Sequence, residues 1–303
     1  QATPELSQVA ELIDWAPFFH VWELRGAYPA ILEADDDKGA QARELFADAQ
    51  RMLAQILSKG WLQARGTYGF FPATARGDDV VLWSDETRER ELMRYCFLRQ
   101  QRRKRNDNAP LLSLADFVAP AEAAIDDYLG AFALTTGLGC EEHVARLEAE
   151  HDDYSAIMLK ALADRLAEAF AEYLHRQVRN EWGFGKQEGA LSLDDLIGAR
   201  YRSIRPAPGY PACPNHDDKT RLFDSLDATG ATGIRLTETC AMLPAASVCG
   251  LYFQHPEARY FAVGNIDRDQ VEAYSTRRGT PLQAAERALA PNLAYTPTDD
   301  RTG

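Results

Sequence analysis

Apolar residues recur at helical spacing in two long parts of the chain, residues 42–57 and 152–178. In the second part the apolar side chains form one stripe, and Glu168 belongs to a separate row of acidic residues spaced four apart. Gly60 follows the first part, at the position where a left-handed residue commonly ends a helix. The pattern therefore predicts two long amphipathic helices, each with one buried face.

Strand-like patterns lie between and after these helices. Residues 67–83 read as two strands joined near Gly77, and residues 127–134 read as a further strand. Residues 248–264 read as a hairpin that turns at His255. Helices and hairpins mingle without a regular strand–helix alternation, so the sequence predicts an α+β fold rather than a doubly wound α/β fold.

Local start and stop signals predict several shorter helices. Pro4 lies where a first-turn proline would open a helix towards Asp14, and Pro17 interrupts the aromatic cluster that follows. Ser192 begins a sequence that resembles a capping box. Further helices are expected over residues 217–227, before Gly279 and after Pro281.

The composition narrows the class of protein. The chain has 303 residues, of which 46% are hydrophobic, enough to bury a large core, and we expect one domain over residues 1–295 and a disordered tail over 296–303. A formal charge of −13 would repel the phosphate backbone of a nucleic acid. The sequence shows neither an apolar run of about 20 residues nor a secretory signal, so no membrane partner is expected.

The cysteines and the first residue bear on where the protein works. Five widely scattered cysteines are typical of reduced thiols, and we therefore expect a cytoplasmic protein. The chain begins with Gln and enters a helical pattern at once. We expect it to be a piece of a longer polypeptide.

Two motifs suggest a site but are better explained by local structure. Gly137 and Gly139 separate a predicted strand from a predicted helix, but the third glycine of a dinucleotide-binding turn is missing. Cys213 and His216 have the spacing of a metal-binding pair, but a structural zinc site needs a second pair, which the sequence lacks. We therefore expect neither a nucleotide on the glycine turn nor a bound metal.

A basic run reverses the acidity of the chain in one place. It contains Arg99, Arg102, Arg103, Lys104 and Arg105. Such a run is either an ordinary solvated segment or a docking patch for an acidic protein, since complementary charge raises the rate of encounter. The sequence leaves both interpretations open.

Four prolines lie within the nine residues 206–214, together with several residues that could bind a ligand. Proline removes a backbone donor and drives the preceding residue towards extended geometry, so Arg205 and Ala207 should be extended and nearby carbonyls should be open to a ligand. Arg205 carries a planar guanidinium suited to a carboxylate, Gly209 permits a tight turn, and Tyr210 can place its ring beside a cation. The segment is either a rigid crossover between helices or a pre-ordered loop for a small ligand, and the choice of residues favours the loop.

The stretch "IRPAPGYPACPNHDDK" (204–219) closely resembles the signature of the activation domain of cobalamin-dependent methionine synthase, which binds S-adenosylmethionine (AdoMet). Four other stretches resemble the same domain in the same order, so that the resemblance covers residues 14–295. They are "LIDWAPFFHVWELRGAYPAIL", "LADFVAP", "HDDYSAIMLKALADRLAEAFAEYLH" and "GLYFQHPEARYFAVGNIDRDQVEAY".

The resemblance implies a fold and a role. The fold would be a single C-shaped α+β domain with a bent antiparallel sheet and surrounding helices. The domain would bind AdoMet and support the reductive methylation of cob(II)alamin to methylcobalamin, with electrons from flavodoxin or a flavoprotein reductase. Cobalamin, folate, homocysteine and the zinc of the homocysteine site would belong to modules outside this chain.

The resemblance also implies roles for individual residues, none of them catalytic. Arg205 would hold the carboxylate of AdoMet, and Ala207 would offer its backbone to the adenine. The other implied contacts are Asp14, Glu168, Tyr210, Tyr260 and Phe261. Two alternatives remain: an interaction domain that docks flavodoxin and the cobalamin module, and a free-standing AdoMet-dependent methyltransferase.

Overall fold

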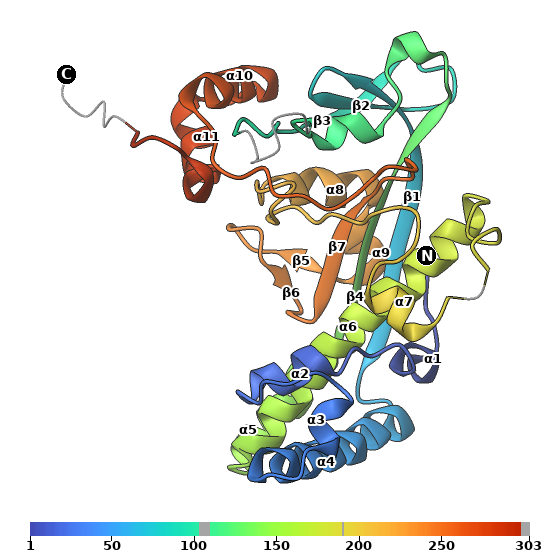
Figure 1. The fold of residues 1–303 in the computed structure, drawn as a ribbon, viewed down its shortest axis with the longest axis vertical. Coiled ribbons are helices and arrows are strands. Elements are labelled where there is room, and N and C mark those ends of the chain that lie inside the picture. The colour runs from blue at the N-terminus through green and yellow to red at the C-terminus, as the bar shows by residue number, and fades with distance from the viewer. Residues whose placement is uncertain (103–109, 190, 298–303) are drawn as a thin grey trace. The chain divides into compact units, whose positions relative to one another are not determined.

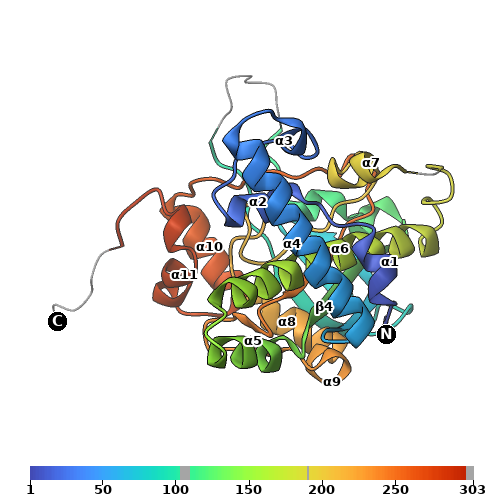
Figure 2. The same ribbon diagram turned by 90° about the horizontal axis from the view of Figure 1, so that it is seen from below.

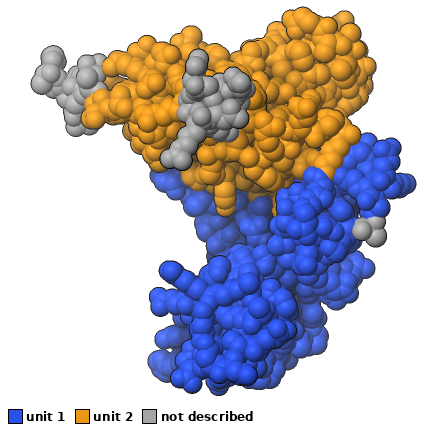
Figure 3. Space-filling view, in the orientation of Figure 1, with its two compact units in different colours: residues 1–67, 133–201, 227–248 blue, residues 68–132, 202–226, 249–303 orange. Residues whose placement is uncertain are grey.

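The computed structural model describes residues 1–102, 110–189 and 191–297. They form two compact units, coloured separately in Figure 3. Unit 1 contains residues 1–67, 133–201 and 227–248, and unit 2 contains residues 68–132, 202–226 and 249–303. The seven predicted site residues are divided between the two units.

Five strands form one sheet in the order β3-β2-β1-β4-β7 (Figure 1). β1 pairs with β2, and β2 with β3, in antiparallel register. The first of these pairs is the hairpin that the sequence predicts around Gly77, whose positive φ of 62° suits the turn. The strands are β1 (Gln63–Arg76), β2 (Asp79–Trp83), β3 (Glu91–Cys96), β4 (Asp127–Leu138) and β7 (Ser247–Tyr252).

Unit 1 is built around two long helices, which confirm the prediction from apolar spacing. α4 (Asp37–Lys59) starts where the Asp36 carboxylate accepts from Gly39 N at 2.8 Å, and it ends at left-handed Gly60. α6 (Asp153–Glu181) packs against α1, α2, α4 and α5, as Figures 1 and 2 show. The other elements of this unit are α1 (Leu6–Ala10), α2 (Ala16–Val21), α3 (Ala30–Glu33), α5 (Cys140–Ala149), α7 (Leu193–Ile197), α9 (Ala228–Thr232), β5 (Arg235–Leu236) and β6 (Met242–Leu243).

Among its described residues, unit 2 adds three α-helices to its part of the sheet, besides the short 3-10 helices Leu114–Phe117, Ala121–Ala123 and Ala290–Asn292. The α-helices are α8 (Asp218–Leu226), α10 (Arg268–Arg278) and α11 (Leu282–Ala288), in the three places that the sequence predicts. α10 and α11 pack together over a cluster of buried residues that includes Val271 and Leu289. Leu293 and Tyr295 pack against the same cluster, which places the end of the described chain on this core. The tail expected over 296–303 falls mostly outside the described residues.

Two local expectations are wrong. Pro17 does not break the aromatic cluster but lies in the first turn of α2, where its missing N–H is not needed. The second arm of the hairpin expected at His255 is not a strand. Phe253 exchanges two hydrogen bonds with Ile204, and Val263 N donates to Pro211 O at 2.8 Å. The two arms therefore pair with the proline-rich segment rather than with each other.

Within the ranges that the structure describes, none of the helices combines the length and the apolar composition needed to cross a bilayer.

Candidate functional site

The proline-rich segment lies along the edge strand β7. Ile204 N donates to Phe253 O at 3.1 Å, and Phe253 N donates back at 3.0 Å. Leu251 N then donates to Pro206 O at 3.0 Å. Pro206 accepts this bond but has no N–H to donate in return, so this pair has one hydrogen bond rather than two. The pairing fixes residues 204–206 as an extended ribbon, as the sequence predicts for Arg205.

Gly250 permits the ribbon to approach the sheet closely. A Cβ at this position would lie 3.0 Å from Pro206 O and 2.9 Å from Phe132 Cε1, so any side chain would push the ribbon outwards. The Phe132 ring in turn stacks on Tyr252, with the ring centroids 4.6 Å apart. The ribbon therefore lies close against the backbone of β7 at Gly250, which limits its movement.

Two tight turns follow the ribbon. Tyr210 N donates to Ala207 O at 3.2 Å, Gly209 N donates to Cys213 O at 2.7 Å, and Cys213 N donates to Tyr210 O at 2.9 Å. Gly209 has a φ of 92°, a value that side-chain-bearing residues rarely adopt. The turns leave Tyr210 at the tip with 61% of its surface exposed.

The expectation that the carbonyls of this segment are open to a ligand is wrong for three of them. Pro206 O, Ala207 O and Pro211 O accept hydrogen bonds from Leu251, Tyr210 and Val263. The amide of Ala207 is different, since its N–H has no partner among the described residues. The backbone can therefore offer a ligand the Ala207 donor rather than these acceptors.

Arg205 lies beside Tyr260, although the two are far apart in the sequence, and Phe261 follows Tyr260 directly. Arg205 N donates to the Tyr260 hydroxyl at 3.0 Å, which ties the ribbon to the segment after β7. The Tyr260 ring is 50% exposed, while Phe261 is half-buried against Phe117 with the ring centroids 6.3 Å apart. With Ala207 and Tyr210, five of the seven predicted site residues lie on these two joined segments of unit 2.

The other two predicted residues lie in unit 1. Asp14 is half-buried just before α2, where its carboxylate accepts from Ala16 N at 3.0 Å. Glu168 is exposed on α6. The Asp14 carboxylate thus stabilises the start of α2, whereas Glu168 lies on the acidic row that the sequence predicts.

The site also rests on a buried polar cluster that sequence reasoning missed. We call it the loop anchor; it consists of Cys213, Asn215, Asp218, Tyr274 and Arg278, all buried. Burial raises the pKa of the Asp218 carboxyl, opposed by the positive charge of Arg278. Burial likewise raises the pKa of the Cys213 thiol, which therefore stays protonated and donates to Asp218. No local sequence signal distinguishes Tyr274 and Arg278 from ordinary helix residues.

Both motifs that were assigned to local structure have a structural explanation. A Cβ on Gly139 would lie 2.4 Å from Trp61 O, so glycine is required for close packing of the turn. Cys213 is a free, buried thiol, and His216 Nδ1 accepts from the Lys219 ammonium at 3.0 Å. Among the described residues, no three His, Cys, Asp or Glu side chains come together in a way that could hold a metal ion.

The basic run is only partly described. The Arg99 guanidinium lies 2.6 Å from an Asp78 carboxylate oxygen and 2.7 Å from one of Asp116, so it has a structural task. Arg102 is exposed. Arg103, Lys104 and Arg105 lie outside the described residues.

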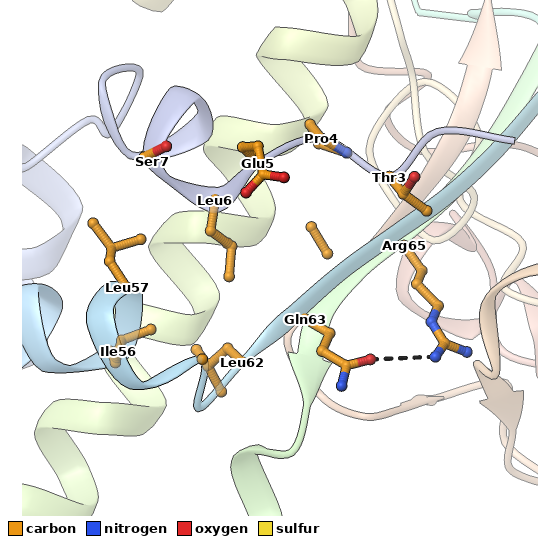
Figure 4. A pocket seen from close by; sticks show the side chains of 12 residues that line it. Thr3, Pro4, Glu5, Leu6, Ser7, Ile56, Leu57, Leu62, Gln63 and Arg65 are labelled. Carbon is orange, nitrogen blue, oxygen red and sulfur yellow. Dashed lines mark hydrogen bonds between the residues drawn. The ribbon is translucent and has the colours of Figure 1, made fainter.

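One cavity of unit 1 lies away from its predicted site residues. It has a volume of about 370 Å³ and is lined by residues 3–7 together with the end of α4 and the start of β1 (Figure 4). Figure 4 shows Arg65 hydrogen-bonded to Gln63 at its rim, at 3.2 Å. Neither Asp14 nor Glu168 lines it.

The sequence of this chain matches that of a known protein family. The model of the family described as "Vitamin B12 dependent methionine synthase, activation domain" matches residues 5–279. The chain belongs to this family, and it is therefore a part of a methyltransferase. A solved structure entitled "Crystal Structure of the MetH Reactivation Domain bound to AdoHcy" is similar to the chain, with 48% sequence identity and a TM-score of 0.93. The match covers 97% of this chain and 90% of that one.

Proposed function

We propose that this chain binds AdoMet on the ribbon of residues 204–210 and its partner residues 260–261, and presents the methyl group to cobalamin held by another module. The observation that carries the proposal is the bond from Arg205 N to the Tyr260 hydroxyl, which joins a carboxylate-binding side chain to an exposed aromatic wall. AdoHcy, the ligand of the similar structure, is what remains of AdoMet after methyl transfer.

The residues present fit AdoMet. The half-buried Arg205 side chain offers the planar pair of donors that a carboxylate accepts. The Ala207 N–H, which has no partner within the described residues, suits an adenine ring nitrogen. The exposed rings of Tyr210 and Tyr260 suit a sulfonium, since an aromatic face attracts a cation. The contributions of Asp14 and Glu168 stay predictions.

We propose that the predicted site residues bind and orient the ligand and have no catalytic role. AdoMet supplies a methyl group that is already activated by its positive sulfur, so the protein needs only to orient it. With 61% of Tyr210 and 50% of Tyr260 exposed, the loop is open enough for an acceptor carried by another module. The chain thus supports the reaction by binding and orientation.

We further propose flavodoxin or a flavoprotein reductase as the electron-donating partner, with Arg102 in the contact. Arg102 is exposed, and a basic surface on a chain of net charge −13 would attract an acidic partner locally.

The five free, buried cysteines support a cytoplasmic location, because reduced thiols persist there.

Calorimetry with AdoMet tests the binding proposal. Arg205→Ala should weaken binding at least several-fold, since a hydrogen bond to a charged group contributes about 1.5–3 kcal/mol. Arg102→Ala removes the same charge from an exposed position outside the loop and should bind like the unaltered chain. Equal affinities of Arg205→Ala and the unaltered chain would exclude the carboxylate role. Undetectable AdoMet binding together with intact flavodoxin binding would favour an interaction domain instead.

A further inference from the structure

Side chains of α10 contact the loop of residues 205–216, which carries Arg205 and Tyr210. Asn215 Nδ2 donates to the Tyr274 hydroxyl at 2.9 Å, and Arg278 Nη1 donates to the same oxygen at 3.1 Å. Arg278 also forms an ion pair with Asp218, at the start of α8. The loop anchor therefore has two attachment points on α10, one neutral and one charged.

The anchor reaches the ligand-binding turns through the backbone. Cys213 Sγ donates to Asp218 Oδ2 at 3.7 Å, and the backbone of Cys213 exchanges bonds with the turn at Gly209 and Tyr210. Asn215 Oδ1 accepts from Asp217 N at 2.9 Å, which fixes the amide orientation of its side chain. A shift of the anchor would therefore shift the turns that carry Tyr210.

α10 is itself fixed to the strands of unit 2, so it can act as a rigid support. Gln270 exchanges two hydrogen bonds with the backbone of Arg99, at 2.7 and 2.9 Å. Arg277 pairs with Asp79 on β2 and donates to Phe97 O at 2.9 Å. The helix is thus held near both ends, by residues on the same face as Tyr274.

The anchor is buried deeply enough for its bonds to matter. Tyr274 is 1% exposed and Asn215 is 3% exposed, so their hydrogen bond is shielded from bulk water. If the hydroxyl were removed, Asn215 Nδ2 would lose this acceptor, whereas Arg278 Nη1 would keep Asp218. Removal of the Tyr274 hydroxyl from α10 should therefore increase the mobility of the loop.

We propose that Tyr274 and Arg278 are positioning residues, which hold the 205–216 loop in its binding geometry through Asn215 and Asp218 without touching the ligand. The inference rests on the proposed function, because the ligand of that loop is taken to be AdoMet. None of the anchor side chains is a predicted ligand contact, so their effect on binding must pass through the loop.

Tyr274→Phe tests the proposal, with Tyr295→Phe as its matched control. The Tyr295 hydroxyl donates to Glu286 at 3.0 Å and does not reach the loop. Two measurements are made on the full chain: calorimetry with AdoMet, and hydrogen exchange of the Gly209 and Cys213 amides, both of which are bonded in the turns. Tyr274→Phe should raise the Kd for AdoMet about fivefold and speed exchange of these two amides about tenfold, while amides of α6 keep their rates.

The outcomes separate this inference from the proposed function. Unchanged exchange of the Gly209 and Cys213 amides in Tyr274→Phe would overturn the positioning role, whether or not AdoMet binds. Faster exchange of every amide, including those of α6, would show a merely structural role and would also overturn it. Failure of the unaltered chain to bind AdoMet would overturn the proposed function alone.

Arg278→Lys provides a second variant that keeps the buried positive charge. Both bonds of Arg278 leave from one nitrogen, Nη1, so the lysine ammonium should retain the pair with Asp218 and give a smaller change in loop exchange than Arg278→Met. Equal exchange in Arg278→Lys, Arg278→Met and the unaltered chain would count against the role of Arg278.

Discussion

Gly209 and His216 approach so closely that a methyl group on Gly209 would lie 2.1 Å from His216 Cε1. Gly209 also has a φ of 92°, so a side chain there is strained before any contact is considered. The backbone conformation and the nearby His216 ring thus both disfavour a side chain at the tip of the loop. The ring of His216 fills the space that a side chain would need.

Gly209→Ala should therefore weaken AdoMet binding at least tenfold and lower the melting temperature. The left-handed backbone alone costs about 1–2 kcal/mol, and the contact with His216 adds to this and displaces Tyr210. Gly60→Ala is the control, because Gly60 has a φ of 63° and nothing within 4 Å of its added Cβ. It should lower stability but leave the affinity for AdoMet unchanged. Equal affinities of the two variants, measured by calorimetry, would contradict the steric account.

Tyr260→Phe should weaken AdoMet binding about threefold. The change removes the acceptor of Arg205 N, and a hydrogen bond between neutral groups contributes about 0.5–1.5 kcal/mol. Water can reach the exposed Tyr260 position and replaces part of the loss. Tyr128→Phe is the control, because its hydroxyl donates to Glu86 at 2.8 Å elsewhere in unit 2. If both variants bind as tightly as the unaltered chain, the Tyr260 hydroxyl has no part in the site.

Elements with strong local signals were predicted well from the sequence. α4 and α6 follow apolar spacing, and α10 ends at Gly279 with a φ of 66°, as a glycine cap predicts. The ribbon was also predicted, because prolines restrict the backbone whatever the surroundings. The need for glycine at 209 was predicted too, but the reason for it, His216, depends on tertiary structure.

Features that depend on long-range pairing could not be predicted. Residues 256–264 carry a strand-like pattern, yet Val263 N donates to Pro211 O, a partner that no local signal indicates. The same pairing explains why the Pro211 carbonyl is not open to a ligand. Tyr274 and Arg278 lie on a helix of mixed polarity, and only packing against the loop shows that they are buried.

Arg102→Glu should slow association with flavodoxin several-fold at low salt, and the difference should shrink as salt is added. Arg102 is preferred to Arg99, whose pairs with Asp78 and Asp116 would be broken by the same change. Arg287→Glu on α11 is the control, because it alters the net charge equally at another exposed position. Stopped-flow measurement that gives equal rates for the two variants would exclude docking at Arg102.

The stability of the protein should depend on pH through the imidazole of His216, which lies next to the loop. Burial, and then the positive charge of Lys219, lowers the pKa of His216 below 6.5. The unfolded chain therefore binds a proton more readily than the folded chain, and stability present above pH 6.5 should be lost as the pH falls through the pKa of the folded state.

Lys219→Met should raise the pKa of His216, because it removes the ammonium that donates to Nδ1. The loss of stability on acidification should then be smaller. NMR titration of the His216 ring gives the pKa, and denaturant unfolding between pH 5 and 7.5 gives the stability. Lys160→Met is the control, since Lys160 pairs with Glu148 in unit 1. A His216 pKa at or above 6.5 in the unaltered chain would contradict the placement of this ring beside Gly209 and Lys219.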